Sequence, residues 1–385
     1  MSRKSRILIV GAGIGGLTAG IALLRNGAEI EIIEKKADNI VYGVGLSQPG
    51  NALRSLKSIG LLDQCYAEGL GADFTEWLRG DGALIARTPS LRLADPDRPA
   101  YNNIGRPALQ RILLAELRQL GAEPRLGATA DVIQTAGDGV DVTFNDGREA
   151  RYDLVLGVDG LRSQTRRMLF GDAFEPVYTG HAVWRVPMER PSGIDCNMIF
   201  FGTGKKAGLI PLSGSTMYFW VVVNAPANER LPRDQFLPLA RRAFSGFGGI
   251  VEDVASTLTS PDRIVYSPIE EVRMPLPWSM GRTVLIGDAA HASGPHLGQG
   301  AAMAMEDAVL AGEMFHDAAS LPEAIAAFQQ RRYPRARFIQ DQTRLMGERG
   351  QMQGRVRCYV RNHFILPRVL PRAADAVERM IAENP

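Results

Sequence analysis

Three glycines near the start of the chain have the spacing of a dinucleotide-binding turn. Gly11, Gly13 and Gly16 form a GxGxxG pattern between an apolar run at 7–10 and a segment with apolar residues at helical spacing. The first glycine of such a turn permits the tight bend, the second lets the backbone approach a pyrophosphate, and the third allows close helix packing. Glu34 ends the next expected strand and can accept hydrogen bonds from ribose hydroxyls. This set predicts a dinucleotide site without separating NAD from FAD.

Two further aspartates follow apolar runs in the same way. Asp159 comes after the run at 155–158 and is followed by Gly160 and three arginines, and Asp288 comes after the run at 283–286 and precedes the sequence PHLGQG at 295–300. Either aspartate alone could be a helix cap, because aspartate caps helices well. Three such turns in this order favour a cofactor site.

A hairpin is predicted in the β-rich part of the chain. The segments 207–212 and 216–223 flank a Ser-Gly-Ser turn at 213–215. If the register is symmetric about Gly214, the even-numbered residues share one face, which joins Lys206 to Tyr218 and Trp220. A slip of one residue would instead set Lys206 beside Met217 and Phe219.

With these motifs the sequence resembles the class A flavoprotein monooxygenases, the para-hydroxybenzoate hydroxylase superfamily, over residues 7 to 332. The resemblance implies that the first motif binds the ADP half of FAD, that the second lies near the pyrophosphate and the NAD(P)H path, and that Asp288 holds the flavin ribitol. It also implies an FAD contact for Arg106. The cofactor-binding residues predicted on this basis are Gly11, Gly13, Gly15, Gly16, Glu34, Lys35, Arg106, Ala130, Asp159, Asp288, Pro295, Gly298, Gly300 and Ala301.

The third motif departs from many members of the family, because Ala301 and Ala302 stand where Gly-Asn is common. Only backbone N–H groups are needed there, so the departure does not weaken FAD binding. A helix that starts near Gly298 to Gly300 would aim its positive end at the flavin ring and stabilise the negative charge of the reduced ring.

Within the family, the sequence is similar in part to the urate hydroxylases and the 6-hydroxynicotinate monooxygenases. The resemblance implies three catalytic residues, Tyr218, His296 and Lys206, with the first two as a proton relay and the lysine as a cation for the phenolate. Each has a structural alternative: Tyr218 as a core aromatic residue, Lys206 as a solvated turn residue, His296 as packing beside the flavin. Three other residues are interpreted as structural: Trp184, Arg185 and His291.

The expected function is that of an FAD-dependent monooxygenase that hydroxylates a small phenolic or N-heteroaromatic compound through a flavin C4a-hydroperoxide. NADH or NADPH and O2 would be co-substrates, and NAD(P)H would bind transiently, because the chain has no second GxGxxG unit. The absence of CxxC argues against disulfide reductases, and the absence of WxWxIP argues against flavin-dependent halogenases. A flavin dehydrogenase or reductase of the same fold, and a catalytically inactive FAD-binding redox sensor with an arginine-rich interaction surface, remain alternatives.

The predicted fold is α/β: a Rossmann-like FAD-binding domain with an inserted β-sheet substrate domain and a helical C-terminal tail. The expected boundaries are 1–175 for the first part of the FAD-binding domain, 176–275 for the β-rich substrate domain, and 276–385 for the second part with the C-terminal helices. A helix is predicted to begin near Gly105, and the Asn-Asp-Gly sequence at 145–147 predicts a hairpin.

Composition sets further limits on the partners. The 385 residues carry a formal net charge of +2 and three well-separated cysteines, so we expect no nucleic-acid or membrane partner, no disulfide framework and a reducing, cytoplasmic location. A homodimer is compatible with these features. The eleven arginines between 331 and 372 face only Asp341 and Glu348. We interpret them as a solvated helical face that binds no polyanion but can pair with acidic surface elsewhere.

Overall fold

The computed structural model describes residues 5–38, 43–225 and 231–384, and its first elements are the expected βαβ unit. Strand β1 (Arg6–Val10) leads into helix α1 (Ile14–Arg25) and then strand β2 (Glu29–Glu34). β1 pairs in parallel with β2 and with β12 (Leu154–Gly157). Parallel strands buried on both faces read as continuous apolar runs, which is why ILIV and LVLG form the centre of this sheet.

This first sheet has six strands in the order β18-β19-β12-β1-β2-β8. β19 (Thr283–Leu285) pairs in parallel with β12, so the chain returns to this sheet after the β-rich segment, as the sequence predicted. The outer strands are β18 (Ser279–Met280) and β8 (Arg125–Leu126). Helix α1 packs against α9 (Gly300–Phe315) and α4 (Arg106–Gln119), which completes the Rossmann-like layer.

Smaller elements surround this layer. A three-stranded antiparallel sheet includes the hairpin predicted at 145–147, and another three-stranded sheet lies beside α4. The elements are β9 (Ala130–Ala136), β10 (Gly139–Phe144), β11 (Glu149–Tyr152), β3 (Gly45–Gln48), β4 (Leu70–Ala72), β7 (Tyr101–Gly105), α2 (Gly50–Ser58), α3 (Leu62–Glu68), α5 (Gln164–Phe170) and α8 (Asp288–His291).

The β-rich segment forms most of a seven-stranded sheet in the order β17-β13-β16-β15-β14-β5-β6. The strands are β17 (Val265–Glu271), β13 (Val177–Glu189), β16 (Thr216–Asn224), β15 (Lys205–Pro211), β14 (Asn197–Phe201), β5 (Phe74–Arg79) and β6 (Leu84–Pro89). β15 pairs with β16 so that Ile210 lies opposite Tyr218 and Gly208 opposite Trp220. The register is therefore symmetric about Gly214, which is the first of the two alternatives that the sequence left open, and the one-residue slip does not occur.

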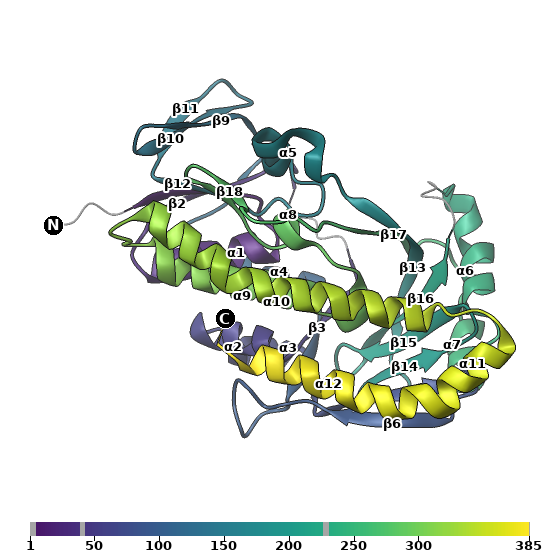
Figure 1. The fold of residues 1–385 in the computed structure, drawn as a ribbon. Coiled ribbons are helices and arrows are strands. Elements are labelled where there is room, and N and C mark those ends of the chain that lie inside the picture. The colour runs from purple at the N-terminus through teal and green to yellow at the C-terminus, as the bar shows by residue number, and fades with distance from the viewer. Residues whose placement is uncertain (1–4, 39–42, 226–230, 385) are drawn as a thin grey trace.

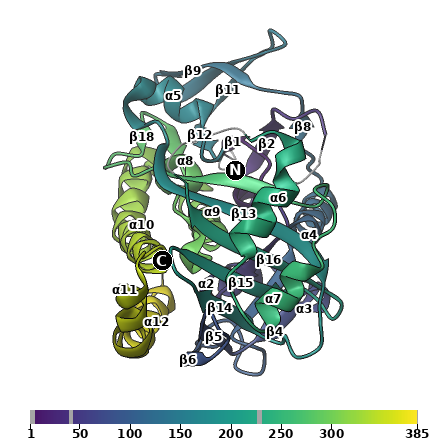
Figure 2. The ribbon, with the colours of Figure 1, turned by 90° about the vertical axis from the view of Figure 1, so that its right-hand side faces the viewer.

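The odd-numbered side chains of this hairpin pack into a core beneath two helices, α6 (Phe236–Phe244) and α7 (Ile250–Ser256). Figure 2 shows both helices on one face of the sheet, with the C-terminal helices along the side of the molecule. The sequence pattern had indicated strands throughout 176–275, and it did not place β5 and β6 in this sheet. The even-numbered face is left to the site described below.

The C-terminal segment is helical, as expected. It contains α9, α10 (Leu321–Gly350), α11 (Arg355–Val360), a π-helical turn at Arg361–Ile365, and α12 (Leu366–Ala382), which lies beside β6 (Figure 1). The interpretation of its arginines as a solvated face is wrong for three of them, because Arg332, Arg335 and Arg361 are buried. Across the described residues, no helix is both long and apolar enough to cross a membrane.

Candidate functional site

A cavity of about 470 Å³ lies between the N-terminal end of α9, helix α12 and the face of the large sheet that carries the even-numbered residues of the β15–β16 hairpin. It brings together residues from distant parts of the sequence. The predicted site residues among its lining are Gly13, Gly15, Arg106, Tyr218, Asp288, Pro295, His296, Gly298, Gly300 and Ala301.

A second cavity, of about 230 Å³, adjoins the first. Gly13, Val158 and Gly160 line both cavities, so the two are neighbours along the glycine turn. The predicted site residues in the smaller cavity are Gly11, Gly13, Glu34, Lys35, Ala130 and Asp159. Two predicted residues, Gly16 and Lys206, line neither cavity.

The glycine turn has the geometry that its spacing predicts. Gly11 has φ +111°, and a Cβ there would lie 2.6 Å from the Val158 carbonyl oxygen. A Cβ on Gly16 would lie 1.9 Å from the Gly11 carbonyl oxygen, so this glycine serves helix packing. A Cβ on Gly13 would meet nothing within 4 Å, which leaves the N-terminus of α1 open to an anion. The turn thus fits the pyrophosphate of a dinucleotide.

Glu34 and Asp159, the acids of the first two nucleotide motifs, already accept hydrogen bonds from other residues of the protein. Glu34 accepts hydrogen bonds from the Ala12 and Lys36 N–H groups at 3.0 and 3.1 Å, which fixes the carboxylate beside the glycine turn. Asp159 accepts from the Thr165 N–H and hydroxyl at 2.9 and 3.0 Å and from the Ser163 hydroxyl. Asp159 therefore accepts hydrogen bonds from the first turn of α5, whose N-cap is Ser163, and it is also a wall of the smaller cavity.

Asp288 faces the larger cavity from the first turn of α8, surrounded by protein yet accessible from the cavity. Burial raises the pKa of its carboxyl, and the positive charges of His291 and Arg106 act in the opposite direction. A Cβ on Gly300 would lie 3.9 Å from its Oδ1 atom. The N-terminus of α9, where no side chain caps the backbone N–H groups, therefore lies next to this carboxylate. A hydroxyl-bearing ligand would meet an acceptor and a positive helix end together.

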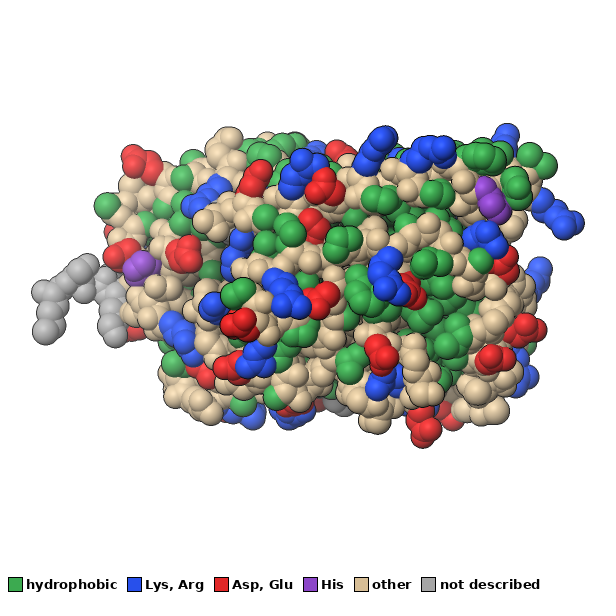
Figure 3. Space-filling view, turned by 90° about the horizontal axis from the view of Figure 1, so that it is seen from below, with side chains coloured by type: hydrophobic (Ala, Val, Ile, Leu, Met, Phe, Trp, Pro, Cys, Tyr) green, Lys and Arg blue, Asp and Glu red, His purple; other side chains and the backbone are tan. Residues whose placement is uncertain are grey.

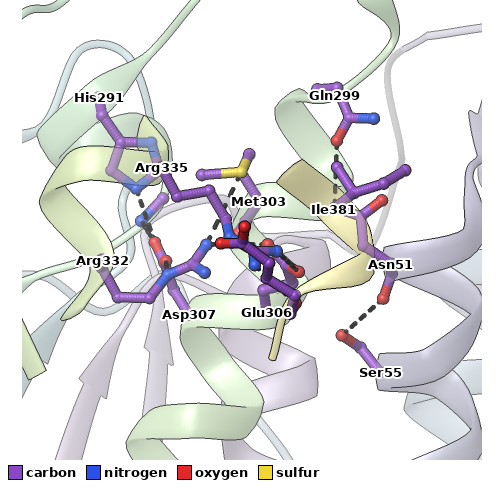
Figure 4. Close-up of polar contacts among 12 residues, drawn as sticks. Asn51, Ser55, His291, Gln299, Met303, Glu306, Asp307, Arg332, Arg335 and Ile381 are labelled. Atoms are coloured by element: carbon purple, nitrogen blue, oxygen red, sulfur yellow. Dashed lines mark hydrogen bonds and ion pairs between the residues drawn. The ribbon is translucent and has the colours of Figure 1, made fainter. Parts of the chain in front are cut away.

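A buried ionic network holds these turns in place (Figure 4). The Asp307 carboxylate accepts from the Gly287 N–H at 2.8 Å, from Arg332 Nε at 2.6 Å, and lies 2.7 Å from His291 Nε2. Burial raises the pKa of Asp307, but Arg332 and His291 outweigh it, so the pKa is held below its usual value. Arg332 and Arg335 also bond to Glu306. His291 thus serves the fold, as the sequence analysis proposed.

Tyr218 and Arg185 lie on the cavity face of neighbouring strands β16 and β13. Burial raises the pKa of Tyr218 to about 12, and the charge of Arg185 acts against this. Burial also lowers the pKa of Arg185, and its guanidinium has no hydrogen-bond or ion-pair partner in the described part of the chain. Arg185 is therefore an unpaired cation in the cavity, although the sequence analysis interpreted it as structural. An arginine inside the apolar strand VWRVP was the signal that could have identified it.

Lys206 lies behind this cavity wall. It is fully buried, its Nζ has no hydrogen-bond partner among the described residues, and it sits 5.6 Å from the centre of the Trp220 ring. Burial lowers its pKa to about 7. The alternative of a solvated turn residue is therefore wrong, and direct contact with a ligand in the cavity is not supported by the lining.

His296 borders the cavity, and its buried Nδ1 also lacks a partner among the residues described. Its ring lies against α10, because a Cβ on Gly347 would come within 2.7 Å of His296 Nε2. Burial lowers the pKa of His296 well below its usual value, and the charges of Lys206 and His181 lower it further. At neutral pH the imidazole is neutral and can accept a proton.

Comparisons with known proteins agree with this geometry. A family model described as an FAD binding domain matches residues 4–343. The 2-heptyl-3-hydroxy-4(1H)-quinolone synthase of Pseudomonas aeruginosa is 32% identical over 375 residues, covering 96% of this chain and 95% of the relative. The 3-amino-4-hydroxybenzoate 2-monooxygenase of Streptomyces cremeus is 33% identical over 359 residues, covering 90% and 88%. Klebsiella pneumoniae HpxO, solved with FAD and uric acid, matches with a TM-score of 0.88 at 24% identity, covering 99% and 97%.

The chain belongs to the class A FAD-dependent aromatic hydroxylases. Its cofactor is FAD, and the two adjoining cavities with their open glycine turn fit a dinucleotide of this size. The hydroxylase fold brings the FAD-side turns and the even-numbered face of the hairpin to one cavity.

Asp288→Ala should lower the affinity of the hydroxylase for FAD by roughly ten- to a hundredfold, since a charge-assisted hydrogen bond is worth roughly 1.5–3 kcal/mol. Flavin fluorescence titration of the apoprotein measures this directly. Asp288→Asn, which keeps an acceptor oxygen, should lose less. Unchanged affinity in both variants would remove Asp288 from the cofactor site.

Asp307→Asn should destabilise the fold by about 3–5 kcal/mol, because it removes one carboxylate of the buried network and leaves Glu306 alone to balance Arg332 and Arg335. Chemical denaturation of the FAD-free protein measures the change. The control is Asp341→Asn, which breaks an exposed pair with Arg273 and should cost no more than about 1 kcal/mol. Equal effects of the two substitutions would show that the network does not stabilise the fold.

Lys206→Met should stabilise the protein at pH 7 and below, with a gain that disappears as the pH approaches 10.5. The folded pKa of about 7 lies below the ordinary value of 10.5. Burying this lysine therefore lowers the free energy of unfolding at every pH at which the unfolded chain keeps the lysine protonated. Each pKa unit is worth about 1.4 kcal/mol. Denaturation at several pH values measures the difference. Lys205→Met is the control, because Lys205 donates to the Ala243 and Ser245 carbonyls and its loss should not stabilise.

Proposed function

We propose that the chain hydroxylates a small phenolic or N-heteroaromatic compound, with NADH or NADPH and O2 as co-substrates. The observation that supports this most is the shared cavity: Tyr218, His296 and Arg185 line the same space as Asp288 and the N-terminus of α9. A ring placed there would lie between groups that can move a proton and the side expected to hold the flavin.

In this proposal the adenosine half of FAD occupies the smaller cavity beside Glu34, and the flavin lies in the larger one. The pyrophosphate crosses the glycine turn at Gly13, and Asp288 accepts from the ribitol. Arg106, whose charge is felt by both Asp288 and Arg185, lies on the flavin side of the cavity. The bound flavin supplies the chemistry that activates O2. Residues 176–275 form most of the substrate roof, with β5 and β6 extending it.

The proposed proton relay follows from the two opposite pKa shifts. His296 is neutral at pH 7 and can take a proton, whereas Tyr218 keeps its proton and can donate a hydrogen bond. The ring hydroxyl of the substrate would pass its proton through Tyr218 to His296, which makes the ring a better nucleophile. Arg185 would then contact the phenolate. Lys206, which we expected as that contact, lies behind the wall, where its charge opposes the protonation of His296.

The shape of the cavity favours an aromatic ring that carries an apolar substituent. Beyond Ile199 and Trp77 the lining reaches the far edge of the sheet and α12, where the residues are mainly apolar or small: Pro89, Leu370, Ala373, Ala374 and Val377. One relative, the 2-heptyl-3-hydroxy-4(1H)-quinolone synthase, is named for a ring with an alkyl chain. We therefore place heteroaromatic rings with apolar side groups first in a substrate panel.

Tyr218→Phe and His296→Ala should each slow hydroxylation by roughly 10²- to 10⁴-fold, the usual contribution of a positioned acid or base. Both should retain FAD. Single-turnover rates, and product formed per NAD(P)H consumed over a panel of aromatic compounds, measure the effect. Matched controls outside the cavity are Tyr178→Phe and His316→Ala. If both site variants formed as much product per NAD(P)H consumed as the wild type, the base would lie elsewhere. NAD(P)H oxidation without any hydroxylated product would favour a reductase, and no NAD(P)H oxidation would favour a redox sensor.

A further inference from the structure

The segment that joins α10 to α12 presents large apolar side chains to solvent. Val356, Tyr359, Val360, Phe364 and Ile365 are 77%, 57%, 41%, 54% and 39% exposed. Residues three and four apart share one face of a helix, so Val356, Val360 and Phe364 form a stripe with Tyr359 beside it. We call these five residues the apolar stripe. Contiguous apolar surface of this kind marks an interaction site more often than isolated exposed residues do.

The opposite face of the same segment is anchored in the protein. Arg361 is fully buried and donates to the Gly202 and Arg349 carbonyls at 2.7 and 2.9 Å. Cys358, Leu366 and Leu370 are buried on the same side. Burying the stripe by rotating the helix would pull this guanidinium away from its acceptors. The stripe is therefore held outward by the packing of the segment.

The segment that carries the stripe has charged residues of one sign. Between Glu348 and Asp375 the chain carries six arginines and no acidic residue. Four of the six are exposed, Arg355, Arg357, Arg368 and Arg372, and none of these four forms an ion pair within the described ranges. The nearby acid Asp81 is already paired with Arg79, which also contacts His363. At the right-hand end of Figure 3, hydrophobic side chains lie among Lys and Arg side chains, and Asp and Glu side chains are also in view.

We propose that the apolar stripe and its four arginines dock this protein on the surface of an anionic lipid bilayer. Apolar side chains on one helical face, flanked by arginines, are the composition of helices that lie in the plane of a membrane interface. Each arginine near an anionic surface strengthens binding about fivefold, the equivalent of ~1 kcal/mol. The net charge of +2, from which we expected no membrane partner, is a sum over the whole chain, so it does not reveal this local excess of positive charge.

Two other occupants fit the charges less well. A two-fold dimer through the same stripe would set the arginines of one copy against those of the other, because the contact of a two-fold dimer is self-complementary. An acidic protein would satisfy the arginines but would need an apolar face of matching shape. A bilayer with anionic headgroups supplies negative charge and an apolar layer side by side.

The test is flotation of the FAD-loaded, full-length protein with phosphatidylcholine vesicles, with and without phosphatidylglycerol. We expect binding only to the anionic vesicles, with weakening at high salt. Replacing Arg355, Arg357, Arg368 and Arg372 together by glutamine should lower vesicle affinity by at least about a hundredfold, given about fivefold per arginine.

Val360→Glu and Phe364→Glu should each abolish flotation while FAD content stays at the wild-type level. The matched controls are Val132→Glu and Val177→Glu, whose valines are 49% and 62% exposed outside the stripe, and both should float like the wild type. No flotation of the wild type, or equal loss in stripe and control variants, would overturn the proposal. So would a wild-type dimer, seen by analytical ultracentrifugation without vesicles, that Phe364→Glu converts to a monomer. None of these outcomes depends on hydroxylation.

Discussion

The arrangement of the cavity depends on the buried carboxylate of Asp307. This one side chain joins the Gly287 turn before Asp288, the imidazole of His291 at the end of α8, and the guanidinium of Arg332 on α10. Because Asp307 lies on α9, the same carboxylate also sets where the open N-terminus of that helix points. A charge in the interior is costly unless every lone pair has a donor, and here three donors surround it. The flavin-side turns therefore form one unit with the C-terminal helices.

The substrate side of the cavity depends on a different constraint, the parity of a strand. Side chains alternate between the two faces of a sheet, so the register of the β15–β16 hairpin decides all of its cavity residues at once. With Ile210 opposite Tyr218, the odd-numbered residues enter the core under α6 and α7, and the even-numbered ones face the cavity. A slip of one residue would exchange the two sets and bury Tyr218 away from the flavin side. Because the odd-numbered residues are buried in the apolar core beneath α6 and α7, the even-numbered residues are kept facing the cavity.

Local patterns predicted much of this structure, and long-range pairings escaped prediction. The glycine turn, the βαβ unit and the hairpin register each follow from residues close in sequence, whose backbone needs and alternation are visible in the chain. The addition of β5 and β6 to the large sheet, whose other strands begin only at Val177, leaves no local trace. The partners of Asp307 are also distant, although the adjacent acids Glu306 and Asp307, among the apolar residues of helix α9, were a signal of buried pairing. The burial of Lys206 could not be read from the sequence, because the helix that covers it lies some 140 residues further on, at Gly350.

The charges that line the cavity limit the kinds of substrate that fit the proposed assignment. Arg106, Arg185, Arg349 and the N-terminus of α9 line it, and Lys206 stands just behind one wall, whereas Asp288 and Glu378 are the acids among the described lining residues. Burial lowers the pKa values of Arg185 and Lys206, which means that their charges cost free energy in the folded protein. An anion between them recovers part of that cost. A substrate that ionises when its ring hydroxyl loses a proton gains this stabilisation at the moment its ring must become nucleophilic, whereas a ring with no acidic proton gains none. Under the proposed assignment, the charges of the cavity therefore favour ionisable rings over simple hydrocarbons, before any property of the cofactor is considered.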